Sequence, residues 1–170
     1  MENTNTKSGL YHEYAYQTTL CRATVCDIDR AFQIMLSSTK FIAPTDEDRP
    51  VTAGMIVNVN VLMTKHNPVR VAVFPITYSI TNTTLPAHIL HPGSVTRKLI
   101  NLAGMIVIDT KGVGSGELQG ASNYLPFNST LGLVLPRKYT PSGAINNTAA
   151  AIVWGGVDEL LKKRIQNNRQ

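Results

Sequence analysis

The sequence predicts an α+β domain in which a mostly antiparallel sheet of five or six strands is covered by two or three helices; a β-sandwich is the alternative. The chain has 170 residues, of which 43% are apolar and 16% charged, which is the size and composition of one folded domain. Several segments rich in Val, Ile and Thr alternate in the manner of strands, and helical periodicity occurs between them. We expect a flexible polar tail at 1–10 and a single globular domain at 11–170.

The domain is expected to begin with a strand that leads into a helix. Residues 11–25 alternate between two faces, one of which carries Tyr14 and Tyr16. Asp27 is suited to cap a following helix, because apolar residues recur after it at the spacing of one helix face up to Leu36.

The rest of the chain supplies further strands and two more helices. Segments 54–66 and 69–81 are rich in Val and Ile and predict an antiparallel hairpin with one apolar face. Ser94 is placed to cap a short helix that Gly104 ends. The remaining elements are expected to be strands at 105–110, 131–136 and 150–154, and a terminal helix at 157–165 after a break at Gly155 and Gly156.

The stretch "MIVIDTKGVGSGELQG" (residues 105–120) runs from an apolar strand into four glycines. A dinucleotide-binding loop needs G-x-G-x-x-G directly before a helix, and neither the offset nor the following sequence fits. Lys111 precedes the glycines instead of following them, so a P-loop is not formed. Val113 stands where a nucleophile elbow around Ser115 needs glycine. We therefore expect no catalytic residue here, and a flexible loop that becomes ordered against a partner.

Cys21, Cys26, His88 and His91 supply the ligand types of a tetrahedral zinc site. Their spacing argues against such a site, because the two cysteines project to opposite faces of a continued strand and the two histidines lie in a predicted loop. Two cysteines are also fewer than the four or more of a small secreted scaffold. We interpret them as reduced thiols of a cytosolic protein, and we expect neither a metal nor a cofactor.

Charge and aromatic residues indicate candidate binding surfaces. Residues 1–50 have a net charge of −2 and residues 51–170 one of +7, and such a field attracts phosphates on nucleic acid or on lipid headgroups. The basic residues expected to bind them are Arg97, Lys98, Arg137, Lys138, Lys162, Lys163, Arg164 and Arg169. The candidate interface aromatics are Tyr11, Tyr14 and Tyr16, whereas Trp154 is expected in the core.

The layout resembles that of the matrix proteins of rhabdoviruses, especially the short ones of plant viruses. An opening strand, "YAYQTTLCRATV", leads to a helix, "DIDRAFQIMLSS", and then to a sheet interrupted by a long loop and closed by a late helix. The resemblance implies a viral structural protein without enzymatic activity, which self-associates, condenses the RNA nucleocapsid and bridges it to an anionic membrane during virion assembly and budding. It places the protein in the virion and the host cytoplasm. The implied self-association loop consists of Gly112, Gly114, Gly116, Glu117, Leu118 and Gly120.

Other functions remain open on the same observations. A plant-virus movement protein would also be rich in strands and would bind single-stranded RNA without sequence preference. A small jelly-roll coat protein would need eight strands. A cytosolic enzyme of unknown chemistry is the least favoured reading. The first twenty residues lack the continuous apolar stretch of a secretory signal, so we expect a protein that is not secreted.

Overall fold

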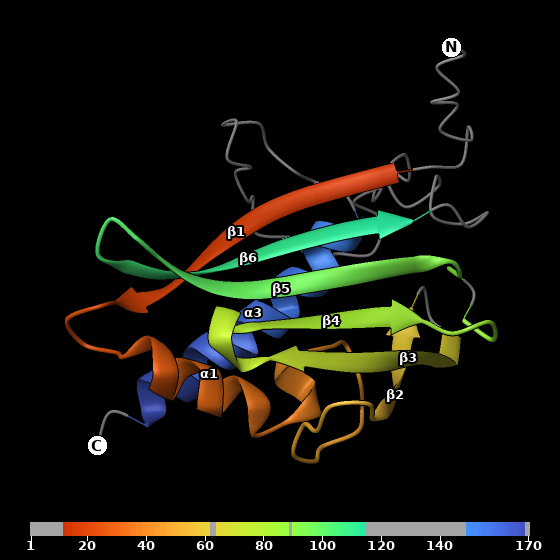
Figure 1. Ribbon diagram of the computed structural model, residues 1–170, viewed down its shortest axis with the longest axis horizontal. Coiled ribbons are helices and arrows are strands. Elements are labelled where there is room, and N and C mark those ends of the chain that lie inside the picture. The colour runs from red at the N-terminus through yellow and green to blue at the C-terminus, as the bar shows by residue number, and fades with distance from the viewer. Residues whose placement is uncertain (1–11, 62–63, 89, 115–148, 169–170) are drawn as a thin grey trace, which may run out of the picture.

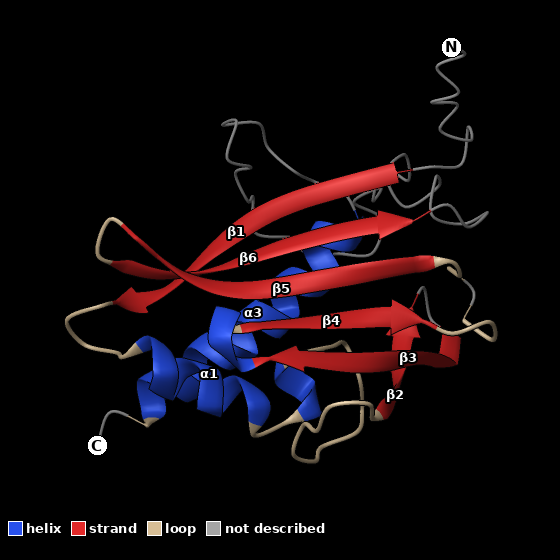
Figure 2. Ribbon diagram, viewed as in Figure 1, coloured by secondary structure: helices blue, strands red, loops and turns tan. Residues whose placement is uncertain are grey.

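The computed structural model describes residues 12–61, 64–88, 90–114 and 149–168, and a six-stranded antiparallel sheet is its central feature. The strands, in the order β1-β6-β5-β4-β3-β2, are β1 (His12–Arg22), β6 (Met105–Gly114), β5 (Gly93–Leu102), β4 (Ser79–Thr84), β3 (Thr64–Phe74) and β2 (Ile56–Val61). The helices in these ranges are α1 (Ile28–Leu36) and α3 (Ala149–Asn167), with two 3-10 helices, η1 (Thr39–Phe41) and η2 (Pro75–Thr77). The predicted α+β class is confirmed, and the β-sandwich alternative is wrong because all described strands belong to one curled sheet (Figures 1 and 2).

The turn between β5 and β6 shows how local chemistry sets the register. Leu102 pairs with Met105, so only Ala103 and Gly104 form the loop, and their φ angles are 50° and 79°. A two-residue loop with positive φ at both positions matches the right-handed twist of the strands, and the second position favours glycine.

The core lies between the sheet and the helices. Asp27 caps α1 as predicted, because its side chain accepts a hydrogen bond from the Arg30 N–H at 3.2 Å. Helix α3 crosses behind the sheet in the view of Figure 1 and contacts β1, η1 and α1. The largest buried apolar side chains of the core are Leu20, Phe32, Met35, Ile42, Val57, Ile80, Leu99, Ile106, Ile108 and Leu161.

The predicted helix between Ser94 and Gly104 is wrong, because residues 93–102 form β5. This strand pairs with β4 on one side and β6 on the other, so its backbone N–H and C=O groups are hydrogen-bonded within the sheet. Several of its residues, such as Val95 and Ile100, are β-branched and suit a strand. Pairing with distant segments therefore decides the conformation here.

The predicted strand at 150–154 and the break at Gly155 and Gly156 are also wrong, since α3 runs through both. An interior glycine weakens a helix by roughly 1 kcal/mol relative to alanine. Packing of an apolar stripe offsets that loss. The side chains of the stripe are the buried Trp154, Val157, Leu161 and Ile165, three or four residues apart. The predicted terminal helix at 157–165 is confirmed as the second half of α3.

Several predicted strands have different ends in the structure. The opening strand ends at Arg22, and the segment predicted as one strand at 54–66 is divided between β2 and the start of β3. The strand predicted at 69–81 stops at Phe74, because Pro75 has no N–H to continue the ladder, and the chain returns as β4 after Tyr78 with φ 50°. The strand predicted at 105–110 continues to Gly114. The strand predicted at 131–136 lies outside the described residues. No helix in the described part of the chain combines the length and apolarity that crossing a membrane requires.

Candidate functional site

Aromatic and polar side chains from three strands and α3 meet inside the fold. The strand register explains why, because Tyr16 lies opposite Thr110 on β6, and Thr110 lies opposite Arg97 on β5. These three side chains therefore form one row on the face that α3 covers. The seven side chains, called the polar cluster below, are Tyr14, Tyr16, Thr18, Arg97, Thr110, Trp154 and Asp158.

An ion pair lies at the centre of the polar cluster. The Arg97 Nη2 group donates to Asp158 Oδ1, and both side chains are 0% exposed. The Thr18 hydroxyl donates to Asp158 Oδ2 at 2.6 Å, and Arg97 Nη1 donates to the Phe41 carbonyl oxygen at 2.6 Å. The pair thus ties together β5, α3, β1 and the end of η1.

Aromatic rings border the ion pair on one side. The Trp154 Nε1–H donates to the Tyr14 hydroxyl oxygen at 2.9 Å, and the Arg97 Cζ atom lies 5.3 Å from the centre of the Trp154 ring. The Tyr14 ring lies directly over Gly112 of β6, where a Cβ atom would overlap with it. Glycine at position 112 therefore lets this ring reach the interior.

Burial keeps the two tyrosines of the cluster uncharged. Loss of water around the phenol raises the pKa of Tyr14 well above its ordinary value. Burial also raises the pKa of Tyr16, and the nearby Asp158 carboxylate raises it further. Both hydroxyls therefore act as hydrogen-bonding groups and not as phenolates at neutral pH.

Among the buried polar atoms of the interior, Arg97 Nε and Asn82 Oδ1 have no hydrogen-bond partner in the structure. The Asn82 side chain extends from the neighbouring strand β4 and donates through Nδ2 to the Ile42 carbonyl oxygen at 2.8 Å. Buried polar atoms without a partner are uncommon in folded proteins and need an explanation, such as a functional role or a bound water. One is a donor and the other an acceptor, so this region can hydrogen-bond an uncharged polar group.

A buried ion pair is weak support for stability, because well-packed apolar residues of the same volume are often as stable or more so. The polar cluster is therefore the best candidate for a functional site in the described part of the chain. Its Arg97 and Asp158 charges cancel, and its rings offer apolar and aromatic contact. Hydrogen-bonding groups and aromatic rings thus lie together at one place in the interior.

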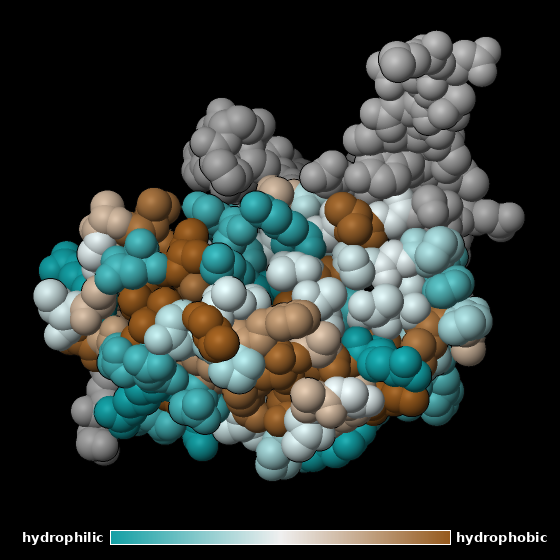
Figure 3. All heavy atoms as spheres, viewed as in Figure 1, coloured by the Kyte–Doolittle hydropathy of each residue, from teal (hydrophilic) through white to brown (hydrophobic). Residues whose placement is uncertain are grey.

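The predicted phosphate-binding residues do not form one surface. Arg97 was expected at the surface and is instead buried against Asp158. Its neighbour Lys98 is exposed on the opposite face of the sheet, where hydrophilic and hydrophobic side chains are interspersed (Figure 3). On α3, Lys163 and Arg164 are exposed and Lys162 is half-buried, 4.0 Å from Glu159. The other three, Arg137, Lys138 and Arg169, lie outside the described residues.

The predicted interface aromatics and self-association loop are also placed differently. Tyr16 is buried and Tyr14 is half-buried, with their ring centres 6.5 Å apart, and the Tyr14 hydroxyl accepts a hydrogen bond from Trp154, so neither side chain extends from the surface as an anchor. Gly112 and Gly114 belong to β6, where Gly114 pairs with His12 and with Gly93. The remaining residues of these predictions, Tyr11, Gly116, Glu117, Leu118 and Gly120, lie outside the described part.

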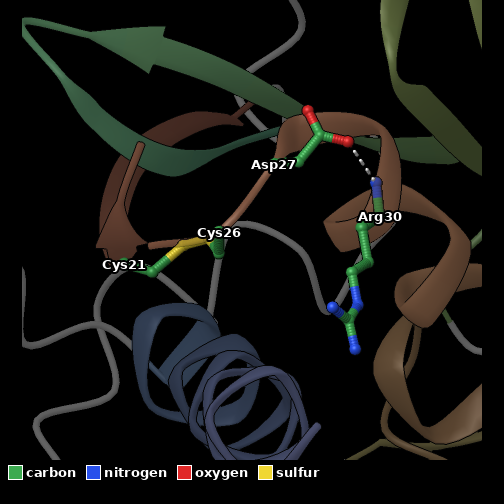
Figure 4. Close-up of a disulfide and its surroundings, with 4 residues drawn as sticks. All are labelled: Cys21, Cys26, Asp27 and Arg30. Atoms are coloured by element: carbon green, nitrogen blue, oxygen red, sulfur yellow. Dashed lines mark hydrogen bonds between the residues drawn. A yellow bond between two sulfur atoms is a disulfide. The ribbon is translucent and has the colours of Figure 1, made fainter. Parts of the chain in front are cut away.

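The two cysteines form a disulfide, which corrects the expectation of reduced thiols (Figure 4). A bulge between Thr19 and Cys21 shifts the register of β1, so Leu20 and Cys21 are both buried instead of facing opposite sides. The following turn then brings Cys26 within 6.2 Å of Cys21, measured between Cα atoms. Among the described residues, no three His, Cys, Asp or Glu side chains are close enough to hold a metal ion.

Sequence reasoning missed Thr18, Thr110 and Asp158 as functional residues. A signal for Asp158 exists, because it lies four residues after Trp154 and one after Val157, so it is on or next to the apolar stripe of α3. A carboxylate at such a position needs a buried partner. Its partner, Arg97, is 61 residues away, and no local pattern identifies it.

No family model and no curated protein matches this chain. Solved structures do resemble it. Ara h 8.0201 is similar at a TM-score of 0.54 and 13% identity, and the alignment covers 93% of this chain and 99% of that chain. Protein MLL2253 from Mesorhizobium loti is similar at a TM-score of 0.55 and 11% identity, and the alignment covers 92% of this chain and 98% of that chain. A norcoclaurine synthase from Thalictrum flavum, a point mutant in complex with a transition state analogue, is similar at a TM-score of 0.50 and 9% identity. The alignment covers 90% of this chain and 95% of the synthase. The di-domain ARO/CYC StfQ of the steffimycin biosynthetic pathway is similar at a TM-score of 0.55 and 12% identity. The alignment covers 94% of this chain but only 52% of StfQ, so the chain spans about half of it.

These similarities overturn the resemblance to rhabdovirus matrix proteins. The predicted matrix function, with its self-association, nucleocapsid or RNA partners and membrane attachment, depended on that resemblance and is wrong. The movement-protein and coat-protein alternatives are wrong as well, since the described strands form one curled sheet packed on a long helix. At these low identities the comparisons show the fold alone: the chain has the Bet v1-like fold, a curled six-stranded antiparallel sheet with a long C-terminal helix.

Proposed function

We propose that this protein binds a small, uncharged and largely aromatic molecule between the sheet and α3, at the polar cluster. The observation that carries the proposal is the position of the Arg97–Asp158 pair, fully buried and bordered by Tyr14, Tyr16 and Trp154. Well-packed apolar residues in place of a buried ion pair are often at least as stable. The polar groups therefore support a role in binding.

The ligand is uncharged because the interior charges already cancel. Arg97 and Asp158 are 0% exposed and neutralise each other. A carboxylate or an ammonium group entering this region would lose its water without gaining a counter-charge, which is unfavourable by several kcal/mol. A hydroxyl or carbonyl group loses much less and can hydrogen-bond to Arg97 Nε or Asn82 Oδ1.

The structural neighbours support a small organic ligand. The norcoclaurine synthase structure is that of a complex with a transition state analogue, and StfQ is an ARO/CYC from a biosynthetic pathway. Both names refer to biosynthesis, although neither neighbour shares more than 12% identity with this chain.

Binding without turnover is the second part of the proposal. General base catalysis needs a group that accepts a proton near neutral pH. Both tyrosines of the cluster are held neutral by burial, and Asp158 is bound by Arg97 and Thr18. The cluster contains no histidine. These groups favour a binding protein over an enzyme.

The experiment compares two probes of the same shape, 2-naphthol and 2-naphthoate, by calorimetry and by thermal unfolding at pH 7. We expect 2-naphthol to bind and to raise the melting temperature. At a concentration 100 times its dissociation constant it stabilises by roughly 2.7 kcal/mol. The naphthoate anion should bind at least about ten-fold more weakly, because its desolvation is not compensated. Mass spectrometry of the recovered 2-naphthol should show no conversion.

Two variants of β5 locate the binding region. Val95→Phe adds volume beside the Tyr16 and Trp154 rings and should weaken 2-naphthol binding. Lys98→Phe makes the matched change on the opposite, exposed face and should leave binding unchanged. The proposal is wrong if neither probe binds, if both bind equally, or if the two variants behave alike.

A further inference from the structure

A second site, separate from the polar cluster, lies between α1 and the C-terminal end of α3. It is a pocket of about 240 Å³. Its apolar lining includes Ala31, Ile34 and Ile165, and its polar lining includes Cys26, Asp27 and Arg30. Sites for drug-sized ligands usually exceed about 300 Å³. This pocket therefore fits a smaller molecule, of the size of an amino acid.

One cysteine of the disulfide forms part of the pocket wall. Cys26 lines the pocket and is 9% exposed, whereas Cys21, at the end of β1, is 5% exposed and is not part of the lining. Access decides which sulfur of a disulfide a thiolate attacks. The structure thus exposes Cys26, and not Cys21, to a molecule bound in the pocket.

The two charged residues of the pocket are complementary to an amino acid. The Arg30 side chain extends from α1, and its Nη2 group donates to the Asn168 carbonyl oxygen (Figure 4 shows Arg30 beside Asp27). The guanidinium has five N–H donors, so others remain for a carboxylate. Asp27 accepts the Arg30 backbone N–H with Oδ2, and its second oxygen can accept from an ammonium group.

We infer that the pocket binds a small zwitterionic thiol of the cysteine class and that the disulfide exchanges with it at Cys26. The thiolate of the ligand attacks Cys26 Sγ, and a new sulfur–sulfur bond forms between the two. The bond between Cys26 and Cys21 breaks, and Cys21 Sγ leaves as a thiolate that takes a proton from water. The ligand sulfur is oxidised and Cys21 is reduced, so no other oxidant or reductant takes part.

The test uses the oxidised full-length protein with L-cysteine and with 2-mercaptoethanol, which lacks both charged groups. The reaction is stopped with excess N-ethylmaleimide at neutral pH and the protein is then acidified and separated from free thiol, and the sites of addition are mapped by mass spectrometry after trypsin digestion. Cleavage after Arg22 separates the two cysteines into different peptides. We expect the cysteinyl group on Cys26 and the maleimide on Cys21. We also expect L-cysteine to react roughly two- to five-fold faster per thiolate than 2-mercaptoethanol, the effect of an exposed ion pair.

Two arginine variants test the role of the pocket. Arg30→Gln should remove the preference for L-cysteine. Arg164→Gln should keep it, because Arg164 is exposed on α3 beside Ile165 but does not line the pocket. Addition to Cys21, equal rates for the two thiols, equal effects of the two variants, or no addition with either thiol would each overturn the inference.

Discussion

Replacement of Arg97 by methionine tests whether the buried ion pair organises the interior. Methionine keeps much of the volume of the side chain but removes the charge that Asp158 pairs with, although Asp158 stays 0% exposed. Removing one member of a buried pair lowers the free energy of unfolding by roughly 3–5 kcal/mol. For a chain of this size, that corresponds to a decrease of about 6–20 °C in melting temperature.

Denaturation by urea, followed by tryptophan fluorescence, measures the effect directly. Trp154 is the only tryptophan of the chain and lies against Arg97, so its emission reports on the same region. Lys98→Met is the matched control, because it makes a similar change at the next residue, on the exposed face of β5. We expect it to change the free energy of unfolding by less than about 0.5 kcal/mol.

The double variant Arg97→Met/Asp158→Leu separates charge from packing. It removes both charges, so no uncompensated ion remains, and we expect it to recover most of the stability that Arg97→Met loses. The reasoning fails if Arg97→Met is no less stable than Lys98→Met, or if the double variant is no more stable than the single one.

Three other perturbations have defined outcomes. Gly112→Ala should lower the free energy of unfolding by roughly 1–3 kcal/mol, because the added Cβ overlaps the Tyr14 ring. In a double-mutant cycle measured by urea denaturation, the same Gly112→Ala change made in a Tyr14→Ala background should lose most of this destabilisation. Reduction with dithiothreitol should lower the stability of the protein by about 2 kcal/mol, as expected for the short loop between Cys21 and Cys26, and should not affect a variant in which both are serine. Burial, and to a lesser degree the charge of His91, lowers the pKa of His88 from 6.5 to about 4, so the folded state binds its proton less well than the unfolded state. The stability is therefore complete above about pH 6.5 and declines as the pH falls towards 4, and His88→Gln should flatten the curve of unfolding free energy against pH in this window; an unchanged curve contradicts the assignment.

Local sequence patterns correctly predict those elements whose cause lies within a few residues. Asp27 caps α1 because its carboxylate reaches the third N–H after it, and residues 105–110 form a strand because most of their side chains are β-branched, which favours strands. The alternation of β1 placed Tyr14 and Tyr16 on one face, although it did not show that this face is the interior. The order of strands and helices also predicted the α+β class. That order is shared by folds with unrelated functions, which is why the resemblance of layout led to the wrong family.

Features that join distant segments depend on tertiary contacts and have no local signal. Residues 93–102 are a strand because β4 and β6 pair with them, and α3 continues through two glycines because its apolar stripe packs into the sheet. The polar cluster joins Thr18 to Asp158 across 140 residues and Arg97 to Asp158 across 61. Periodicity and capping describe interactions within one or two turns of chain, whereas register, burial and charge pairing depend on which segments the curled sheet brings together. The sequence therefore predicts Arg97 as a surface charge. Its burial against Asp158 follows only from the packing of α3 on the sheet.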